Sequence, residues 1–177
     1  MRQLLTLTLA LFAFQQTPIY AQTHPAPATA PAPIAEKHLK NIRQLTFGGD
    51  NAEAYWSPDS KWLTFQSNNA KWGLQCDQIF AMKVKSAAGD STYKPLKIST
   101  MKGRTTCSYF MPDGKHILYA STHKGGDACP QTPDLRSGGK YLWPVFETFD
   151  IFVADLKGNI TKQLTNTKGY DADADDE

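Results

Sequence analysis

The chain has 177 residues, which is enough for one domain but not comfortably for two. Its 19 basic and 17 acidic residues leave a formal net charge of +2, so we expect no broad electrostatic field for binding nucleic acid. Negative charge is concentrated at the C-terminal end, in residues 171–177.

The first 21 residues have the pattern of a secretory signal peptide. Arg2 gives a positive start, residues 4–14 form a short and mostly apolar run, and Ala21 is a small residue at the expected cleavage point. The apolar run is too short for a membrane-spanning helix. We therefore expect a mature chain that begins at Gln22, no membrane span, and a periplasmic or secreted location. A buried N-terminal helix is the alternative interpretation.

Residues 22–40 are expected to form an extended linker. Ala, Pro and Thr dominate this segment up to about residue 35, and such a composition buries too little apolar surface to fold. Residues 41–46 then alternate in polarity, which predicts a short strand. The glycines and Asx residues of segment 47–51 predict a loop.

Two segments that lie 54 residues apart each predict a β-hairpin with a proline-containing turn. The first turn is Pro58-Asp59-Ser60, and the second is Pro112-Asp113-Gly114, in which Gly114 supplies a positive φ. Runs rich in aromatic and β-branched residues flank both turns. These runs predict strands at 53–57, 61–67, 104–110 and 116–122.

Two further strands are predicted after each hairpin. They lie at 77–84 and 95–99 in the first unit and at 149–155 and 160–165 in the second. Four antiparallel strands in a unit of this length are typical of a propeller blade. The expected fold is therefore an all-β propeller with about two complete four-stranded blades. Blade 1 is expected at 47–100 and blade 2 at 101–166. A string of immunoglobulin-like strands is the alternative, but it does not explain the recurring turn.

Short motifs recur along the chain in a fixed order. They are Arg43-Gln44-Leu45-Thr46, Trp56-Ser57-Pro58-Asp59-Ser60-Lys61, Asp77-Gln78-Ile79-Phe80, Met111-Pro112-Asp113-Gly114-Lys115, Asp150-Ile151-Phe152-Val153-Ala154-Asp155 and Gln163-Leu164-Thr165-Asn166-Thr167-Lys168-Gly169-Tyr170. In order and repetition they resemble the TolB-type β-propeller repeat family of bacterial envelopes. The likeness covers roughly residues 41–172.

The resemblance implies that this chain is the N-terminal part of a longer propeller. Residues 41–46 resemble the fourth strand of a blade, so we expect them to close a ring by pairing with a C-terminal blade. Residues 167–177 resemble the start of a further blade. Because propellers need at least about four blades, we expect either missing C-terminal blades or self-association of this chain.

The resemblance also implies a non-catalytic, exported protein that acts in protein–protein interaction at the bacterial cell envelope, with a protein partner that it does not identify. The alternative is a regulatory or substrate-gating propeller of a peptidase-like enzyme whose catalytic domain is absent. The sequence has no Gly-x-Ser-x-Gly nucleophile elbow, and no enzyme activity is expected.

A long loop, residues 123–148, is predicted within the second unit. It contains an apolar patch that includes Tyr141, Trp143 and Phe146. Long ordered loops on a rigid scaffold often carry binding, so these three residues are candidate binding residues. The alternative is that the patch folds back over its own blade.

Two other tryptophans, Trp56 and Trp62, flank the first hairpin turn. We expect both to pack between blades. Stacking of tryptophan on a sugar or a peptide is the alternative interpretation.

Three cysteines, Cys76, Cys107 and Cys129, are candidates for a disulfide, because export places them in an oxidising compartment. We expect a bridge between Cys107 and Cys129, and Cys76–Cys107 is the rival pairing. No CxxC or HxxxH spacing supports zinc binding, so neither a metal nor a cofactor is expected.

Overall fold

The computed structural model describes residues 37–134, 137–140 and 143–172. The chain divides into two units between Lys40 and Asn41, and all the strands belong to the second unit. The predicted signal peptide (1–21) and most of the predicted linker (22–36) lie outside the described residues. Among the residues that are described, no helix is long and apolar enough to cross a membrane.

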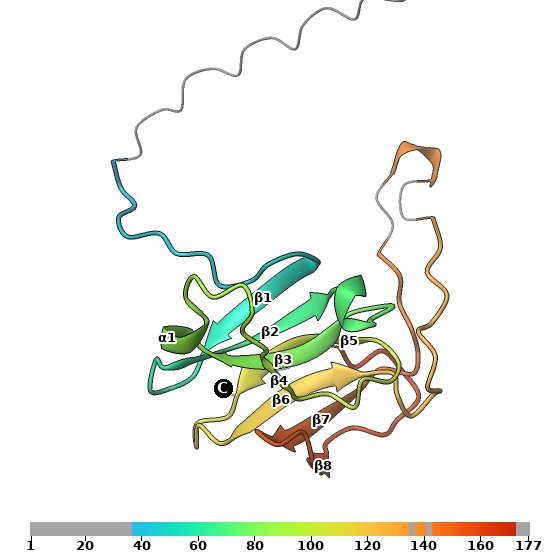
Figure 1. The fold of residues 1–177 in the computed structure, drawn as a ribbon. Coiled ribbons are helices and arrows are strands. Elements are labelled where there is room, and N and C mark those ends of the chain that lie inside the picture. Colours follow the sequence, from blue (N-terminus) through green and yellow to red (C-terminus); the bar gives the residue numbers. More distant parts are fainter. Residues whose placement is uncertain (1–36, 135–136, 141–142, 173–177) are drawn as a thin grey trace, which may run out of the picture. The chain divides into compact units, whose positions relative to one another are not determined.

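The prediction of an all-β fold is confirmed, because the described residues form two four-stranded antiparallel sheets (Figure 1). The first sheet has the order β1-β2-β3-β4, and the second has the order β5-β6-β7-β8. The strands are β1 (Asp50–Trp56), β2 (Trp62–Asn68), β3 (Gln78–Lys83), β4 (Leu96–Lys97), β5 (Thr105–Phe110), β6 (His116–Ser121), β7 (Asp150–Asp155) and β8 (Ile160–Gln163). Helical segments are short, at η1 (Ala70–Trp72), α1 (Val84–Ala87) and η2 (Ser137–Gly139).

Every strand predicted after residue 50 is present, with small shifts at the ends. The strand predicted at 41–46 is not, and that prediction is wrong. Within the part of the chain that the structure describes, no strand pairs with this segment. It is attached instead by the Gln44 carbonyl, which accepts a hydrogen bond from Gly89 N at 3.0 Å, and by packing of Leu45 on the first sheet. A ring-closing role for 41–46 stays a prediction.

The two hairpin turns have the same construction, as predicted. In each, the aspartate after the proline accepts a hydrogen bond from the backbone N–H two positions later, at 3.1 Å for Asp59 and 2.8 Å for Asp113. The residue directly after the aspartate has a left-handed φ, which is 55° at Ser60 and 62° at Gly114. The chain therefore makes one turn geometry twice, once with glycine and once with a strained serine.

Each first strand carries a β-bulge at the same position. The register shifts between Ala52 and Tyr55 in β1 and between Thr106 and Tyr109 in β5. Glu53 and Cys107 occupy the two bulges with nearly equal φ values of 48° and 47°. Left-handed φ values are uncommon for such side chains, so their recurrence shows that the two sheets are copies of one backbone design.

The two sheets stack with one face of the first sheet against the opposite face of the second, an arrangement that we call head to tail. We call the side of the first sheet that carries Ile79 and Ala81 its front face, and the opposite side its back face. The equivalent back face of the second sheet, which carries Tyr119 and Phe152, packs on that front face in one buried cluster. The members of the cluster are Ile79, Ala81, Ile98, Phe110, Ile117, Tyr119, Phe152 and Ala154.

The outer surfaces of this stack are covered differently. The back face of the first sheet, with Phe65 and Phe80, is covered by its own connecting segments, including Trp72 and Tyr93. The front face of the second sheet is apolar and is packed by fewer partners. Its buried residues are Leu118, Ala120, Phe149, Ile151, Val153 and Ala172, with Met111 and Phe146 beside them.

The two predicted packing tryptophans have different environments. Trp62 packs against the cluster between the sheets, as expected. Trp56 is 53% exposed, so the prediction that it packs between blades is wrong for this residue. The reason is that Trp56 lies on the back face of the first sheet, on which no other sheet packs within the described residues.

Candidate binding site at the junction of the two sheets

The candidate site lies where the segment before β3 meets the start of β5. The Asp77 carbonyl accepts hydrogen bonds at 3.0 Å from both Thr105 N and Thr105 Oγ1. This contact fixes the beginning of the second sheet against the first.

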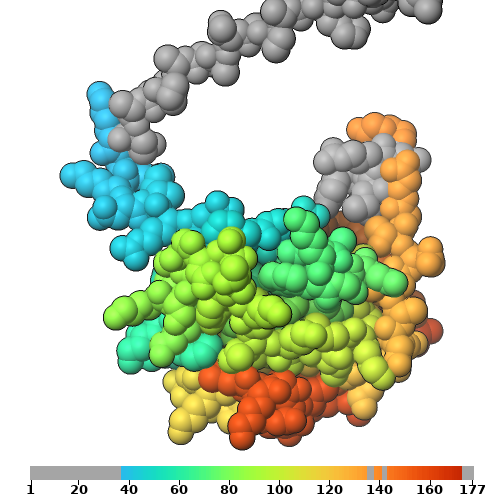
Figure 2. Space-filling model, viewed as in Figure 1, coloured from blue at the N-terminus to red at the C-terminus, as the bar shows by residue number. Residues whose placement is uncertain are grey.

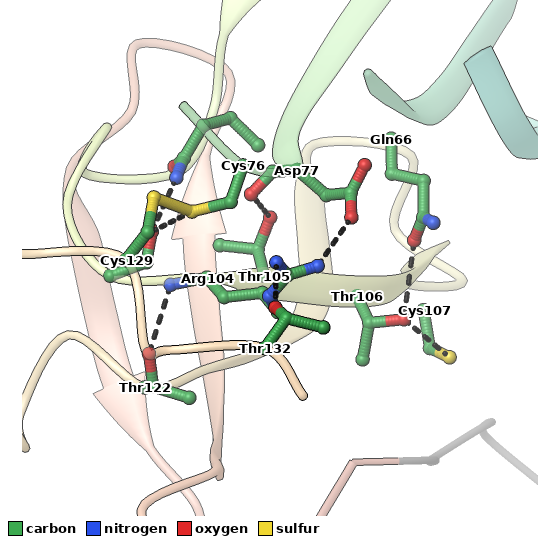
Figure 3. A network of polar contacts seen from close by, with 12 residues as sticks. Gln66, Cys76, Asp77, Arg104, Thr105, Thr106, Cys107, Thr122, Cys129 and Thr132 are labelled. Atoms are coloured by element: carbon green, nitrogen blue, oxygen red, sulfur yellow. Dashed lines mark hydrogen bonds and ion pairs between the residues drawn. A yellow bond between two sulfur atoms is a disulfide. The ribbon is translucent and has the colours of Figure 1, made fainter. Parts of the chain in front are cut away.

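An ion pair joins the same two segments (Figure 3). Arg104 Nη1 lies 3.1 Å from Asp77 Oδ2, and the two side chains are 23% and 22% exposed. Arg104 Nη2 also donates to Thr132 Oγ1 at 3.0 Å, and Arg104 N donates to Thr122 Oγ1 at 2.9 Å. Arg104 Nε is buried and has no hydrogen-bond partner among the described residues. The guanidinium therefore has hydrogen-bonding capacity that the surrounding residues do not use.

Burial and the neighbouring charges act in opposite directions on the pKa of Asp77. Burial raises the pKa of the Asp77 carboxyl above its ordinary value, and the Arg104 guanidinium offsets only part of that increase. The negative charges of Asp50 and Glu53 add to the increase. The ion pair therefore lies in a region where both dehydration and nearby carboxylates disfavour the Asp77 anion.

A second polar contact bridges the sheets one residue further along β5. Thr106 Oγ1 donates to Gln66 Oε1 at 3.2 Å, and it lies 3.3 Å from Cys107 Sγ. Gln66 belongs to β2 and Thr106 to β5, so this bond also crosses between the sheets (Figure 3).

The disulfide joins Cys76 to Cys129, with the two Cα atoms 6.0 Å apart. Both predicted pairings, Cys107–Cys129 and Cys76–Cys107, are wrong. Cys107 lies inside β5 at its bulge, whereas Cys76 and Cys129 both lie in connecting segments near the Gly103 carbonyl. The bridge ties the loop after β6 to the segment before β3, beside the Arg104–Asp77 pair (Figure 3).

Gly103 allows these segments to approach one another. Its φ is 60°, and a Cβ there would lie 2.6 Å from Thr122 Oγ1 and 2.8 Å from His123 N. Its carbonyl accepts a hydrogen bond from Gln78 Nε2 at 2.7 Å. A side chain at this position would therefore push apart the backbone that holds Arg104 in place.

The ion pair forms part of a pocket of about 250 Å³. Its lining combines polar side chains, which we call the polar wall, with aromatic side chains, which we call the aromatic wall. The lining residues are Gln66, Asp77, Arg104, Thr105, Thr106, Thr132, Trp143, Pro144, Phe146, Phe149 and Tyr170. The aromatic wall comes from the end of the long loop and from the segment after β8, so residues distant in the sequence form this single site. The loop projects from the body of the two sheets (Figure 2).

The three predicted binding residues are placed differently. Trp143 is 63% exposed at the pocket, and its Nε1 donates to the Tyr170 hydroxyl at 3.2 Å. Phe146 also lines the pocket, but it packs against the front face of the second sheet. Tyr141 lies outside the described residues. The patch thus partly projects and partly folds back, and its role in binding stays a prediction.

The polar wall of the pocket was not predicted from the sequence. Asp77 directly follows Cys76 in the motif Cys-Asp-Gln-Ile, and Arg104 lies three residues before Cys107 in the motif Arg-Thr-Thr-Cys. Cys107 is not part of the disulfide, so the only signal that the two motifs share is their opposite charge. Without the fold, nothing in the sequence indicates that the two segments meet.

One contact between a serine and a histidine is present in the described residues. Ser121 Oγ lies 2.9 Å from His123 Nδ1, but the serine is wholly buried, which removes it from any substrate. Burial also lowers the pKa of His123. Within the described ranges, no group of three or more His, Cys, Asp or Glu side chains gathers at one point.

No protein-family model matches the chain, and a search of curated proteins finds no match. The function is therefore inferred from the sequence motifs and from the geometry of the two sheets and the pocket.

Proposed function

We propose that the chain is a segment of an exported, TolB-like β-propeller that acts in protein–protein interaction at the bacterial cell envelope without catalytic activity of its own. The observation that carries this proposal is the head-to-tail stacking of two sheets with equal topology. When the front face of one unit packs on the back face of the next, each end of the stack keeps one face to which another unit can bind. Repeating this contact generates a ring if the rotation between successive units closes. Propellers are rings of this kind.

The front face of the second sheet supports the same proposal. Ile151 and Val153 occupy the positions that Ile79 and Ala81 occupy in the first sheet, where the second sheet covers them. The equivalent surface is thus apolar in both sheets. A third sheet of the same design has a suitable surface on which to pack.

We call the contact between the segment before β3 and the start of β5 the first junction. The segment after β8 makes the equivalent contacts with the residue before β7. Asp171 N donates to the Phe149 carbonyl at 3.2 Å, as Thr105 N donates to the Asp77 carbonyl. Ala172 then lies on the front face of the second sheet. These contacts are those expected where a further unit of the repeat begins.

Export is supported by the disulfide, because intrachain bridges persist mainly in oxidising compartments such as the periplasm. The proposed contact surface for a partner is the outer side of the long loop. Val145 is 62% exposed there and does not line the pocket. Exposed apolar side chains on a projecting loop are suited to protein contact.

The proposal is tested by site-specific photo-crosslinking in the exporting bacterium. We expect p-benzoylphenylalanine in place of Val145 to give adducts with another envelope protein, identified by mass spectrometry. The matched control carries the same group in place of Trp56, which is equally apolar and 53% exposed but lies on β1. Equal adducts from both positions, or none from either, would contradict a contact through the loop.

A further inference from the structure

A hydrogen bond and a ring contact hold the aromatic wall of the pocket beside the Arg104–Asp77 pair in place. Trp143 Nε1 donates to the Tyr170 hydroxyl, and the Tyr170 ring meets Phe149 edge to face with the ring centroids 5.6 Å apart. Trp143 is 63% and Tyr170 37% exposed. The two linked rings therefore present apolar surface to a ligand while their polar atoms are already hydrogen-bonded.

The polar wall of the pocket carries no net charge. Arg104 and Asp77 neutralise each other across 3.1 Å. Because the two charges of this pair largely cancel, the pair offers neither a ligand cation nor a ligand anion a strong net attraction. The pocket is therefore suited to a neutral ligand.

This wall offers both donors and acceptors. A guanidinium has five N–H groups, and the bonds of Arg104 to Asp77 and Thr132 use one each. The Thr106 hydroxyl and the Gln66 amide stand beside it. A ligand with adjacent hydroxyl groups can donate to the acidic side and accept from the basic side.

The size of the pocket limits the ligand further. Its volume of about 250 Å³ is below the range of roughly 300–1,000 Å³ that is usual for small-molecule sites. It therefore accommodates one ring rather than an extended molecule. The ring must have an apolar face for the aromatic wall and a hydroxylated edge for the polar wall.

We propose that this pocket binds a single neutral pyranose sugar ring, with the apolar face of the ring on Trp143 and its hydroxyls toward Arg104, Asp77 and Thr106. An aromatic side chain from a peptide fits the aromatic wall equally well. It would, however, cover the polar wall without pairing its hydrogen-bonding groups, and such desolvation is unfavourable. This inference is independent of the proposed protein contact, because Val145 does not line the pocket.

The test is an NMR titration of the isotope-labelled full chain with its disulfide intact. The probes are methyl β-glucopyranoside, methyl β-galactopyranoside, N-acetylglucosamine and its linear tetramer, and N-acetyltryptophanamide as the peptide probe. We expect at least one sugar to shift the Trp143 indole N–H and the Thr106 amide. Trp143→Ala should weaken sugar binding about tenfold or more. Trp56→Ala removes an equally exposed tryptophan outside the pocket and should leave sugar binding unchanged.

A second variant separates the polar wall from the aromatic wall. Thr106→Val keeps the side-chain shape but removes the hydroxyl, and we expect it to weaken sugar binding about fivefold while the rest of the amide spectrum is unchanged. Tighter binding of the tetramer than of N-acetylglucosamine identifies a glycan chain as the source of the ring, and equal binding identifies a free or terminal sugar. The proposal is overturned if no sugar shifts the pocket resonances, if Trp143→Ala has no effect, or if only N-acetyltryptophanamide binds.

Discussion

Trp56 and Phe110 occupy the same position in the two sheets but have opposite environments. Trp56 ends β1 opposite Leu63, and Phe110 ends β5 opposite Ile117, the equivalent residue. Trp56 is 53% exposed, whereas Phe110 is only 3% exposed within the cluster between the sheets. The burial of an aromatic residue at this position is thus decided by whether another sheet covers the back face of its own sheet, and not by the strand itself.

The junctions that start successive units show a second difference. Asp77 and Arg104 form an ion pair at the first junction, and Phe149 and Tyr170 form an edge-to-face aromatic pair at the second. The backbone hydrogen bond is the same in both. The geometry of the junction is therefore set by the backbone, and the side-chain chemistry is free to vary. That freedom is what gives the pocket one polar and one aromatic wall.

The largest expected effect tests the contrast between the two aromatic positions. Phe110→Ala should lower the free energy of unfolding by about 3–5 kcal/mol, because it leaves a cavity between the sheets. Trp56→Ala should lower it by about 1 kcal/mol or less, because most of that ring is already in water. Urea denaturation of both variants measures the difference. Equal losses would show that the two sheets do not stack in solution as they do in the structure.

Breaking the disulfide should have the next largest effect. The bridge links residues 53 positions apart, so Cys76→Ser with Cys129→Ser should lower the free energy of unfolding by about 2–4 kcal/mol, mainly by freeing the unfolded chain. Because the bridge holds the loop that carries Thr132, the double variant should also broaden the NMR signals of the pocket. Cys107→Ser is the matched control and should have neither effect. Peptide mapping without reduction identifies the bridged cysteines directly. A bridge that includes Cys107 would contradict the structure.

Double-mutant cycles compare the two junctions directly. The aromatic pair, tested with Phe149→Leu and Tyr170→Leu, should give a coupling free energy of about 0.5–1.5 kcal/mol that salt does not change. The half-buried ion pair, tested with Asp77→Asn and Arg104→Gln, should give a coupling of roughly 1 kcal/mol or less that decreases with added salt. A salt-independent coupling at the first junction would mean that Arg104 acts through packing rather than charge.

Converting one residue of the second sheet to its first-sheet equivalent should stabilise the protein. Tyr119 corresponds to Phe65 in register. Its hydroxyl has no hydrogen-bond partner among the described residues, and burial raises its pKa to about 12. Tyr119→Phe should therefore raise the free energy of unfolding by up to about 1 kcal/mol. Tyr93→Phe is the matched control and should lower it slightly, because the Tyr93 hydroxyl accepts a hydrogen bond from Lys83 N at 3.0 Å. A loss on Tyr119→Phe would indicate that a buried water pairs the hydroxyl.

The smallest expected effect is a pH dependence confined to the first junction. Burial raises the folded-state pKa of Asp77, so the folded state holds that proton more tightly than the unfolded chain does. The contribution of this carboxyl to the free energy of unfolding is then largest below the unfolded pKa of about 3.9 and is lost as pH rises through the folded pKa. Wild type should therefore lose stability relative to Asp77→Asn as pH rises above about 3.9. The opposite trend would mean that the attraction to Arg104 outweighs burial.

The strands and turns of this protein were predictable because their determinants are local. The aromatic and β-branched runs are strand formers, and Pro58 and Pro112 preset a turn that the following aspartates complete. The 54-residue spacing also predicted that the two units are alike. The segment 41–46 shows the limit of this reasoning, because its alternating pattern has no partner strand within the described residues.

The pairing of the cysteines, the exposure of Trp56 and the polar wall of the pocket were decided only by the tertiary structure. Asp77 meets Arg104 because the start of the second sheet crosses the segment before β3, and Cys76 meets Cys129 because the loop after β6 reaches the same segment. Residues on separate segments meet through a relative rotation and translation of two sheets, which no local propensity specifies. The sequence by itself determined two copies of a four-stranded sheet, since hydrogen-bonded ladders and turns depend on nearby residues. The stacking of those copies determined which side chains are buried and which line the site, because burial depends on what packs over a surface.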